Sequence, residues 1–305
     1  MSADTMPVPA PVTPKKVSRK SAAAAEAGNA LSSRWASLFA VVMAVLWTIP
    51  TFGLFITSFR PQADIQDSGW WSFFRNPSFT LDNYKEALFG GDTNLSNYFV
   101  NSIIIVIPAV IAPVFLACLA AYAFAWIDFK GRNFLFVAIF ALQIVPLQIA
   151  LIPLQTIYVD RGMAGTFWPI WISHTIFALP LAVFLLHNFM KEIPRELVEA
   201  ARVDGAGHVK IFLQVLLPLL TPALAAFGIF QFLWVWNDLL VALTFGPSPD
   251  VAPLTVRVAE LSGTKDQAWY LLSAGAFISI AVPMAVFLSL QRFFVRGLLA
   301  GGLKG

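Results

Sequence analysis

The stretch EAARVDGAGHVKIFLQVLLP, from Glu199 to Pro218, places charged residues and glycines directly before a long apolar run. The residues just before it, KEIPREL, are also rich in charge. A polar segment, 191–214, therefore lies between two long hydrophobic runs. This arrangement is typical of a loop at a membrane surface, where charged side chains stay in water while the flanking runs cross the hydrocarbon.

The composition of the whole chain agrees with a membrane location. Of its 305 residues, 58% are hydrophobic and only 12% are charged, and the chain has 28 Phe and 10 Trp. So few polar side chains could not coat a soluble globule of this size. Cys118 is the single cysteine, which excludes an intrachain disulfide and predicts that its thiol serves packing.

Six runs are long enough to cross a hydrocarbon core, which needs about 20 apolar residues. Each is expected to be a helix, because no water is available there to pair the backbone. Prolines inside several runs, Pro146 among them, predict kinks and a bent, packed bundle. The predicted spans are 36–58, 99–127, 134–159, 167–190, 215–245 and 269–291.

The distribution of basic residues predicts the orientation of the spans. The segments 1–35, 128–133, 191–214 and 292–305 hold 14 of the 20 Lys and Arg. By the positive-inside rule both termini are expected in the cytoplasm. We therefore expect a disordered basic cytoplasmic tail over 1–35, a transmembrane domain over 36–291 and a cytoplasmic C-terminal tail over 292–305.

The cytoplasmic segment 191–214 should contain a short helix. Pro194 suits a first helical position, Glu196 and Glu199 lie near the positive helix end, and Gly205 or Gly207 would end it. Spacings of three and four then place four residues on one face: Leu197, Ala200, Ala201 and Asp204. Small residues there permit another protein to approach closely. Any loop between spans needs charges and a turn, so this pattern alone leaves a purely structural role open.

The stretch from Glu199 to Pro218 resembles the EAA motif of ABC importer permeases. That motif is Glu-Ala-Ala, three residues, Gly, nine residues, an aliphatic residue, one residue and Leu-Pro; Val215 stands where the family most often has Ile. The resemblance implies that the segment forms a coupling helix that sits in a cleft of an ATPase subunit. The residues expected to couple are Leu197, Glu199, Ala200, Ala201, Asp204 and Gly205.

The resemblance extends over nearly the whole chain after residue 35. FTLDNYKEAL, NYFVNSIII, WVWNDLL and the ending LQRFFVRGLLAGGLKG are similar to the carbohydrate, maltose-type branch of these permeases. It implies an all-α ABC importer type I fold with six transmembrane helices in a bacterial cytoplasmic (inner) membrane. The implied partners are a second homologous permease, two ATP-binding cassette ATPases that bind the ATP, and an extracytoplasmic sugar-binding protein.

Three further expectations follow from the resemblance. The C-terminal residues Gly297 to Gly305 would reach the ATPase interface. The outer loop residues Leu261, Ser262, Gly263 and Thr264 would contact the sugar-binding protein. The ending and GTKDQAWYLLSAGAFIS look most like the α-glucoside and glucose branch.

Polar residues within the spans are candidates for the translocation path. Asp238 is the only carboxylate in the six runs, and an ionisable group at membrane depth marks a functional site by default. Aromatic rings suit the apolar faces of sugars, and amides suit hydroxyls, although aromatics in spans also serve simple packing. The candidates are Gln231, Trp234, Asn237 and Asp238. Interhelical hydrogen bonds are expected from Gln143, Gln148, Gln155 and His174.

Several functional classes lack their signature. The chain has no GxxxxGK[ST] phosphate loop, so we expect it neither to bind nor to hydrolyse ATP, and it has no metal-ligand spacing and no catalytic constellation. We therefore expect no enzyme activity, cofactor, metal or nucleic-acid partner. The alternative is a self-sufficient secondary transporter or channel for a small polar solute, which would be expected to show an intramembrane ion relay or half-repeats.

Overall fold

The structure, a computed structural model, describes residues 34–91, 93–263 and 269–302, and within these ranges it is helical without any β-strand. The chain divides into two compact units, Met1–Leu54 and Phe55–Gly305, which are described separately. The first contains most of α2 (Arg34–Ser58). Residues 1–33 of the predicted N-terminal tail lie outside the described residues.

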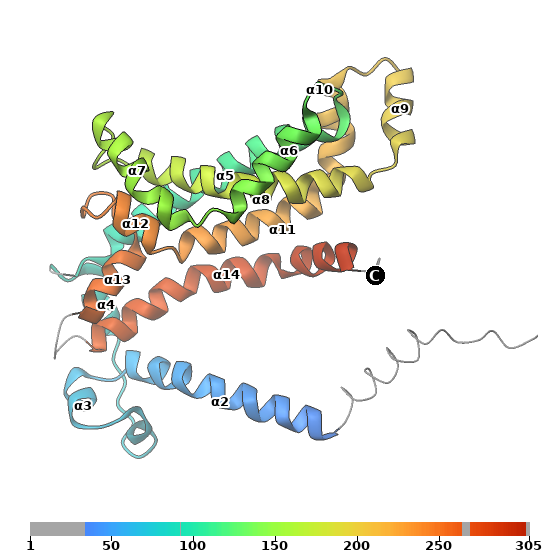
Figure 1. The fold of residues 1–305 in the computed structure, drawn as a ribbon. Helices are drawn as coiled ribbons and strands as arrows, with labels where there is room; N and C mark the ends of the chain where they lie inside the picture. The colour runs from blue at the N-terminus through green and yellow to red at the C-terminus, as the bar shows by residue number, and fades with distance from the viewer. Residues whose placement is uncertain (1–33, 92, 264–268, 303–305) are drawn as a thin grey trace, which may run out of the picture. The chain divides into compact units, whose positions relative to one another are not determined.

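The second unit holds the remaining helices, which Figure 1 shows in chain order by colour. Its long helices are α5 (Leu95–Trp126), α8 (Trp168–Glu192), α11 (Leu217–Trp236) and α14 (Trp269–Gly302). The shorter helices are α3 (Gln62–Asp67), η1 (Trp70–Phe74), α4 (Asp82–Phe89), α6 (Arg132–Ala141), η2 (Leu142–Ile144), α7 (Leu147–Asp160), α9 (Arg195–Val203), α10 (His208–Ile211), η3 (Phe212–Leu216), α12 (Leu240–Phe245) and α13 (Leu254–Gly263).

Five helical segments of the described chain are long and apolar enough to cross a membrane: 34–58, 95–126, 168–192, 208–236 and 269–290. Four of the predicted spans agree with these segments to within a few residues, and the fifth, 215–245, corresponds to 208–236. The third predicted span, 134–159, is not one continuous helix, although it supplies the sixth span when its two pieces are counted together. It consists of two helical pieces, Arg132–Ile144 and Leu147–Asp160, bent by 98°.

The bend falls at a proline, and its local cause is clear. Pro146 has no N–H to donate, and its ring disfavours helical backbone at Val145, which is extended at φ −74° and ψ 120°. Prolines elsewhere do not break their helices: α5 continues through Pro108 and Pro113, and α8 through Pro180. A proline in an apolar run therefore permits a break without requiring one.

The fifth span ends differently from the prediction, and the helix of the sixth continues beyond its predicted span. α11 stops at Trp236, and after Asn237, Asp238 and Leu239 the separate helix α12 begins, so 215–245 is not one helix. The polar Asn237–Asp238 pair interrupts a run that is apolar on both sides. α14 instead continues to Gly302, through eleven residues of the predicted C-terminal tail, and only 303–305 lie outside the described chain.

The second unit has two main apolar cores. One joins α4, α5, α7, α8, α11, α12, α13 and α14, and the other joins α5, α8, α9, α10, η3 and α11. α5 and α8 form the most extensive helix pair, with buried alanines four residues apart on each: Ala117 and Ala121, and Ala178 and Ala182. Small residues at this spacing let two backbones approach closely.

Enlarging one of these alanines should destabilise the second unit. Ala182 has 0% of its surface exposed, so Ala182→Leu must displace neighbouring side chains, at a cost of about 1–3 kcal/mol. We expect a lower thermal unfolding midpoint in detergent. The matched control is Ala285→Leu on the exposed side of α14, which should leave the midpoint nearly unchanged. Equal midpoints for the two variants would contradict this packing.

The end of the unit that carries α4, α12 and α13 is fixed by buried polar side chains (Figure 1). On α5, the Asn101 amide donates to the backbone carbonyls of Pro249, Asp250 and Ala252 at 3.3, 3.1 and 3.1 Å, and the Ser102 hydroxyl accepts from Leu254 N–H at 2.8 Å. These bonds hold the loop before α13 against the start of α5.

Candidate functional site

α9 begins directly after Pro194 and ends at a left-handed glycine. Pro194 has ψ 131° and so precedes the helix instead of occupying its first position. Gly205 has φ +78° and donates to the Arg202 carbonyl at 3.0 Å, while Ala206 donates to the Ala201 carbonyl at 2.9 Å. This is the Schellman pattern, which pairs carbonyls left free at a helix end. Of the two glycines considered from the sequence, Gly205 ends the helix.

Replacing Gly205 by Ala should therefore strain the loop. An added Cβ would meet no atom within 4 Å, so the expected cost of about 1–2 kcal/mol comes from the positive φ alone. We expect faster hydrogen exchange of the α9 amides. Gly207→Ala is the matched control, because Gly207 has equally open space but an ordinary φ of −77°. Equal exchange in both variants would contradict the assignment of Gly205 as the cap.

One side of α9 packs against the rest of the second unit, and the other side is exposed. Val198 is only 2% exposed and Ala201 is partly buried against the same core cluster. Val203, by contrast, is 88% exposed. We call five of the exposed residues the outer face of α9: Leu197, Glu199, Ala200, Val203 and Asp204. The prediction that Ala201 shares a face with Leu197, Ala200 and Asp204 needs correction, because those three are exposed while Ala201 is partly buried against the chain's own core.

The segment after α9 is tied to the membrane helices. The Tyr122 hydroxyl of α5 and Nδ1 of His208 lie 2.6 Å apart, and Ile211 is buried in the core. The following turn, η3, is a π-helix in which Leu217 N–H donates to the carbonyl of Phe212, five residues back. Pro218 has no N–H to continue the ladder, which fits a widened turn just before it. The segment after α9 is thus joined to α5 through His208 and leads through η3 into α11.

A cavity of about 420 Å³ opens at the bend between α6 and α7. Its walls include Gln143 and Gln148 on either side of the bend, Phe177 on α8 and Trp234 on α11. None of its described lining residues is Asp, Glu, Lys, Arg or His. The volume lies in the range that holds small ligands, and aromatic walls with amides suit a neutral polar molecule.

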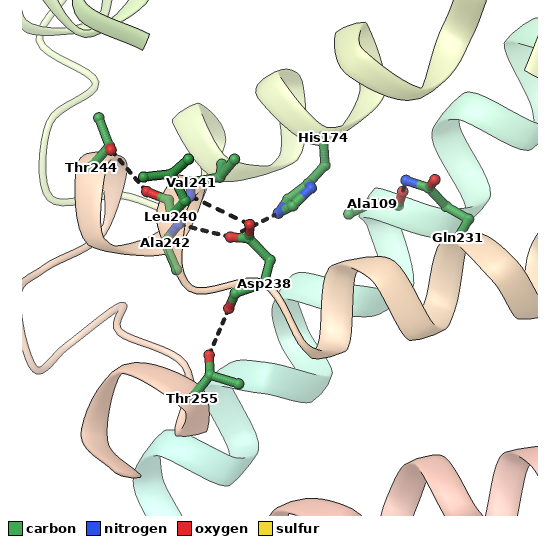
Figure 2. A network of polar contacts seen from close by, with 9 residues as sticks. All are labelled: Ala109, His174, Gln231, Asp238, Leu240, Val241, Ala242, Thr244 and Thr255. Atoms are coloured by element: carbon green, nitrogen blue, oxygen red, sulfur yellow. Dashed lines mark hydrogen bonds and ion pairs between the residues drawn. The ribbon is translucent and has the colours of Figure 1, made fainter. Parts of the chain in front are cut away.

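Asp238 lies beyond the end of α11, and its carboxylate points toward His174 and the start of α12 (Figure 2). Its carboxylate accepts the N–H groups of Val241 and Ala242 at 3.4 and 3.0 Å, and so caps α12. Its Oδ2 lies 3.8 Å from Nε2 of His174 on α8, and its carbonyl accepts from the Thr255 hydroxyl at 2.8 Å. The sequence suggested Asn237 as its partner; its carboxylate instead contacts His174 on α8 and the first N–H groups of α12.

The four path candidates from the sequence do not share one site. Gln231 is 0% exposed and donates to the Ala109 carbonyl at 3.1 Å, which joins α11 to α5 (Figure 2). Asn237 is exposed, and its side chain donates to the Leu233 carbonyl at 2.7 Å. Only Trp234 lines the cavity. The structure therefore separates one wall residue, Trp234, from Gln231 and Asp238, which join different helices, and from Asn237, which bonds at the end of its own helix.

The outer-loop candidates also differ from one another. Leu261 is buried in the core with α13, whereas Ser262 is exposed and its hydroxyl donates to the Ala259 carbonyl. Gly263 is the last residue of α13, and Thr264 lies outside the described residues. Leu261 thus anchors the helix end and is not available to a partner.

Comparison with known proteins identifies the family. Residues 113–299, which include α9, the cavity and Asp238, match the model for the binding-protein-dependent transport system inner membrane component. The chain belongs to this family of inner membrane permeases. The permease is therefore a transport component and not an enzyme, and the family name implies a substrate-binding protein and an ATPase as its partners. In the described chain, no three His, Cys, Asp or Glu side chains gather as a metal site.

Individual relatives agree with the family. The permease is 49% identical over 269 residues to the osmoprotective compounds uptake permease GgtD of Synechocystis sp., covering 87% of this chain and 90% of GgtD. It is also 49% identical over 235 residues to the alpha-glucoside transport system permease AglG of Rhizobium meliloti, covering 75% of this chain and 61% of AglG. A solved bacterial ABC transporter involved in alginate import shares the fold, with a TM-score of 0.71 at 22% identity over 86% of this chain and 98% of that one.

The cavity was not predicted from the sequence, although a signal for it was present. Gln143 and Gln148 flank Pro146, so two amides stand on either side of the one intramembrane proline that breaks its span. Considered separately, they suggested only interhelical hydrogen bonds. Their joint role in a cavity wall depends on the 98° bend, which the residue types alone do not specify.

Proposed function

We propose that the permease imports a neutral sugar of the α-glucoside class through the cavity at the α6–α7 bend. The observation that carries this proposal is the cavity wall: the Trp234 and Phe177 rings with the Gln143 and Gln148 amides, and no charged group. Rings favour the apolar faces of a sugar, and amides both donate to and accept from hydroxyls. A charged solute would lack a counter-charge there and be costly to desolvate.

The names of relatives support the same substrate class. AglG is named for alpha-glucosides, and a relative 34% identical over 92% of this chain, MelC of Bacillus subtilis, is named for melibiose, raffinose and stachyose. These substrates are neutral oligosaccharides, which agrees with the uncharged wall.

The proposed assembly contains four transport subunits and a binding protein. This permease pairs with a second homologous permease, and two ATPase subunits dock on the cytoplasmic side, where both termini lie. The outer face of α9 enters the ATPase cleft, and the Ser262–Gly263 end of α13 meets the extracytoplasmic sugar-binding protein. When ATP drives the two ATPase subunits to close, they move α9. The contact between His208 and Tyr122 carries that movement to α5. The cavity then opens alternately to the two sides of the membrane.

Reconstitution of the complete transporter into vesicles tests the function. We expect ATP-dependent uptake of radiolabelled maltose, sucrose or trehalose, and little uptake of a glucuronide of similar size. Gln148→Leu should weaken uptake by raising the half-saturating sugar concentration, since it removes one amide from the wall. Uptake by the permease alone without ATPase, or a preference for the glucuronide, would contradict the proposal.

A further inference from the structure

The buried contacts of His174 connect two features of the site described separately above. His174 is on α8 and is 1% exposed. Its Nε2 faces the Asp238 carboxylate, while its ring stands edge-on to the Trp234 indole, with centroids 6.1 Å apart and planes at 86°. Edge-to-face pairs at this separation are favourable. His174 therefore contacts both residues that bracket the end of α11.

The contact with Trp234 has a consequence for the cavity. Trp234 contributes its wall on the α11 side, while Ile176, Phe177 and Pro180 contribute the wall on α8, the helix that also carries His174. His174 itself does not line the cavity, so it would not touch a bound solute. It is placed to determine where the Trp234 ring lies.

We propose that His174 is a positioning residue that holds the Trp234 indole in the cavity wall and thereby determines how tightly the sugar is held. The ring edge of His174 carries this role, while Asp238 caps α12 and keeps the adjoining backbone in place. The expected effect on sugar binding rests on the proposed function, because it requires the cavity to lie on the sugar path. The expected effect on the position of the Trp234 indole does not depend on it.

Three substitutions separate the two contacts of His174. His174→Ala removes both, His174→Phe keeps a ring edge toward Trp234, and His174→Gln keeps a polar group toward Asp238. His187→Ala is the matched control. It is the other buried histidine of α8, but its ring packs on Phe136, and neither residue lines the cavity.

The first measurement needs no substrate. In the assembled transporter carrying Cys118→Ala, a cysteine is placed in the cavity wall as Gln148→Cys, and its rate of reaction with a small methanethiosulfonate reagent is followed. We expect His174→Ala and His174→Gln to speed the reaction about threefold or more, because the Trp234 ring moves into the vacated space. His174→Phe and His187→Ala should stay within about twofold of the parent.

The second measurement is uptake of radiolabelled maltose. We expect His174→Ala to raise the half-saturating concentration about threefold to tenfold, the range of one aromatic contact, with maximal rate per transporter changed less than about twofold. If His174 acts through Trp234, combining His174→Ala with Trp234→Ala should be no worse than Trp234→Ala alone. A purely structural role would instead lower the amount of active protein and leave the half-saturating concentration unchanged.

The outcomes distinguish the two proposals. Two results would overturn the positioning role of His174. In the first, His174→Ala leaves the labelling rate of Gln148→Cys unchanged. In the second, His174→Gln keeps the parent labelling rate and His174→Phe does not. A labelling rate that responds as expected, together with Trp234→Ala having no effect on half-saturation, keeps His174 as the residue that positions Trp234 but removes the cavity from the sugar path.

Discussion

A permease with Trp in place of Ala200 is expected to lose its ATPase on purification while still inserting into the membrane. Ala200 is exposed on the outer face of α9, and a helix held in a partner's cleft has no room for an indole at a close contact. We expect at least about tenfold less ATPase to co-purify, which corresponds to about 1.4 kcal/mol or more of lost binding. Uptake should fall in parallel.

Two matched variants make this result specific. Ala200→Ser keeps the side chain small and should retain the ATPase. Ala201→Trp would be less informative, because Ala201 is partly buried against the permease's own core and an indole there disturbs the fold as well as the interface. Full ATPase retention by Ala200→Trp would place the docking surface elsewhere.

Replacing Asp238 by Leu should have the second large effect. The carboxylate accepts two α12 amides, and Leu would leave both donors without their acceptor in a partly buried position. An unpaired buried donor costs about 1–3 kcal/mol, so the thermal unfolding midpoint should fall clearly. Asp238→Asn keeps one acceptor oxygen, so its thermal unfolding midpoint should fall much less.

A neighbouring carboxylate supplies the control for Asp238. Asp250 is exposed, so Asp250→Leu should change the unfolding free energy by no more than about 0.5 kcal/mol. Midpoints for Asp238→Leu and Asp250→Leu that fall together would contradict the capping role of Asp238. If Asp238→Asn were as unstable as Asp238→Leu, the negative charge at this position would be what stabilises the fold, and not the hydrogen bonds from the α12 N–H groups.

The spans could be predicted from composition because hydrocarbon leaves a chain little choice but helix. The break at Pro146 could not. The same residue type lies within continuous helices at Pro108, Pro113 and Pro180. Whether a proline bends its helix slightly or ends it depends on whether neighbouring helices take up the freed carbonyl, and that is a property of the packed bundle.

Local signals were sufficient for α9 and insufficient for Asp238. Gly205 ends α9 through bonds that span only a few residues, so the motif spacing predicted it well. The contact of Asp238 with His174 joins positions 64 residues apart, on different helices, and no sequence spacing encodes that distance. The sequence showed that Asp238 was unusual but not what it contacts.

Helical spacing also left the depth of side chains undetermined. Ala201 and Leu261 were expected at partner surfaces, yet both lie against the permease's own core. A short helix packs one side against the core. When alanines lie on several sides of the helix, residue size does not indicate which side is the buried one. Val198, which is buried, and Val203, which is exposed, differ only in the direction they face.

Site-directed cross-linking tests the docking of the ATPase on α9 most directly. In full-length permease carrying Cys118→Ala, single cysteines are placed as Val203→Cys on the outer face of α9 and as Ser262→Cys at the end of α13; both side chains are exposed. With a short bifunctional reagent, Val203→Cys is expected to join the ATPase and Ser262→Cys is not. Cross-linking of the ATPase from Ser262→Cys, with none from Val203→Cys, would contradict the account.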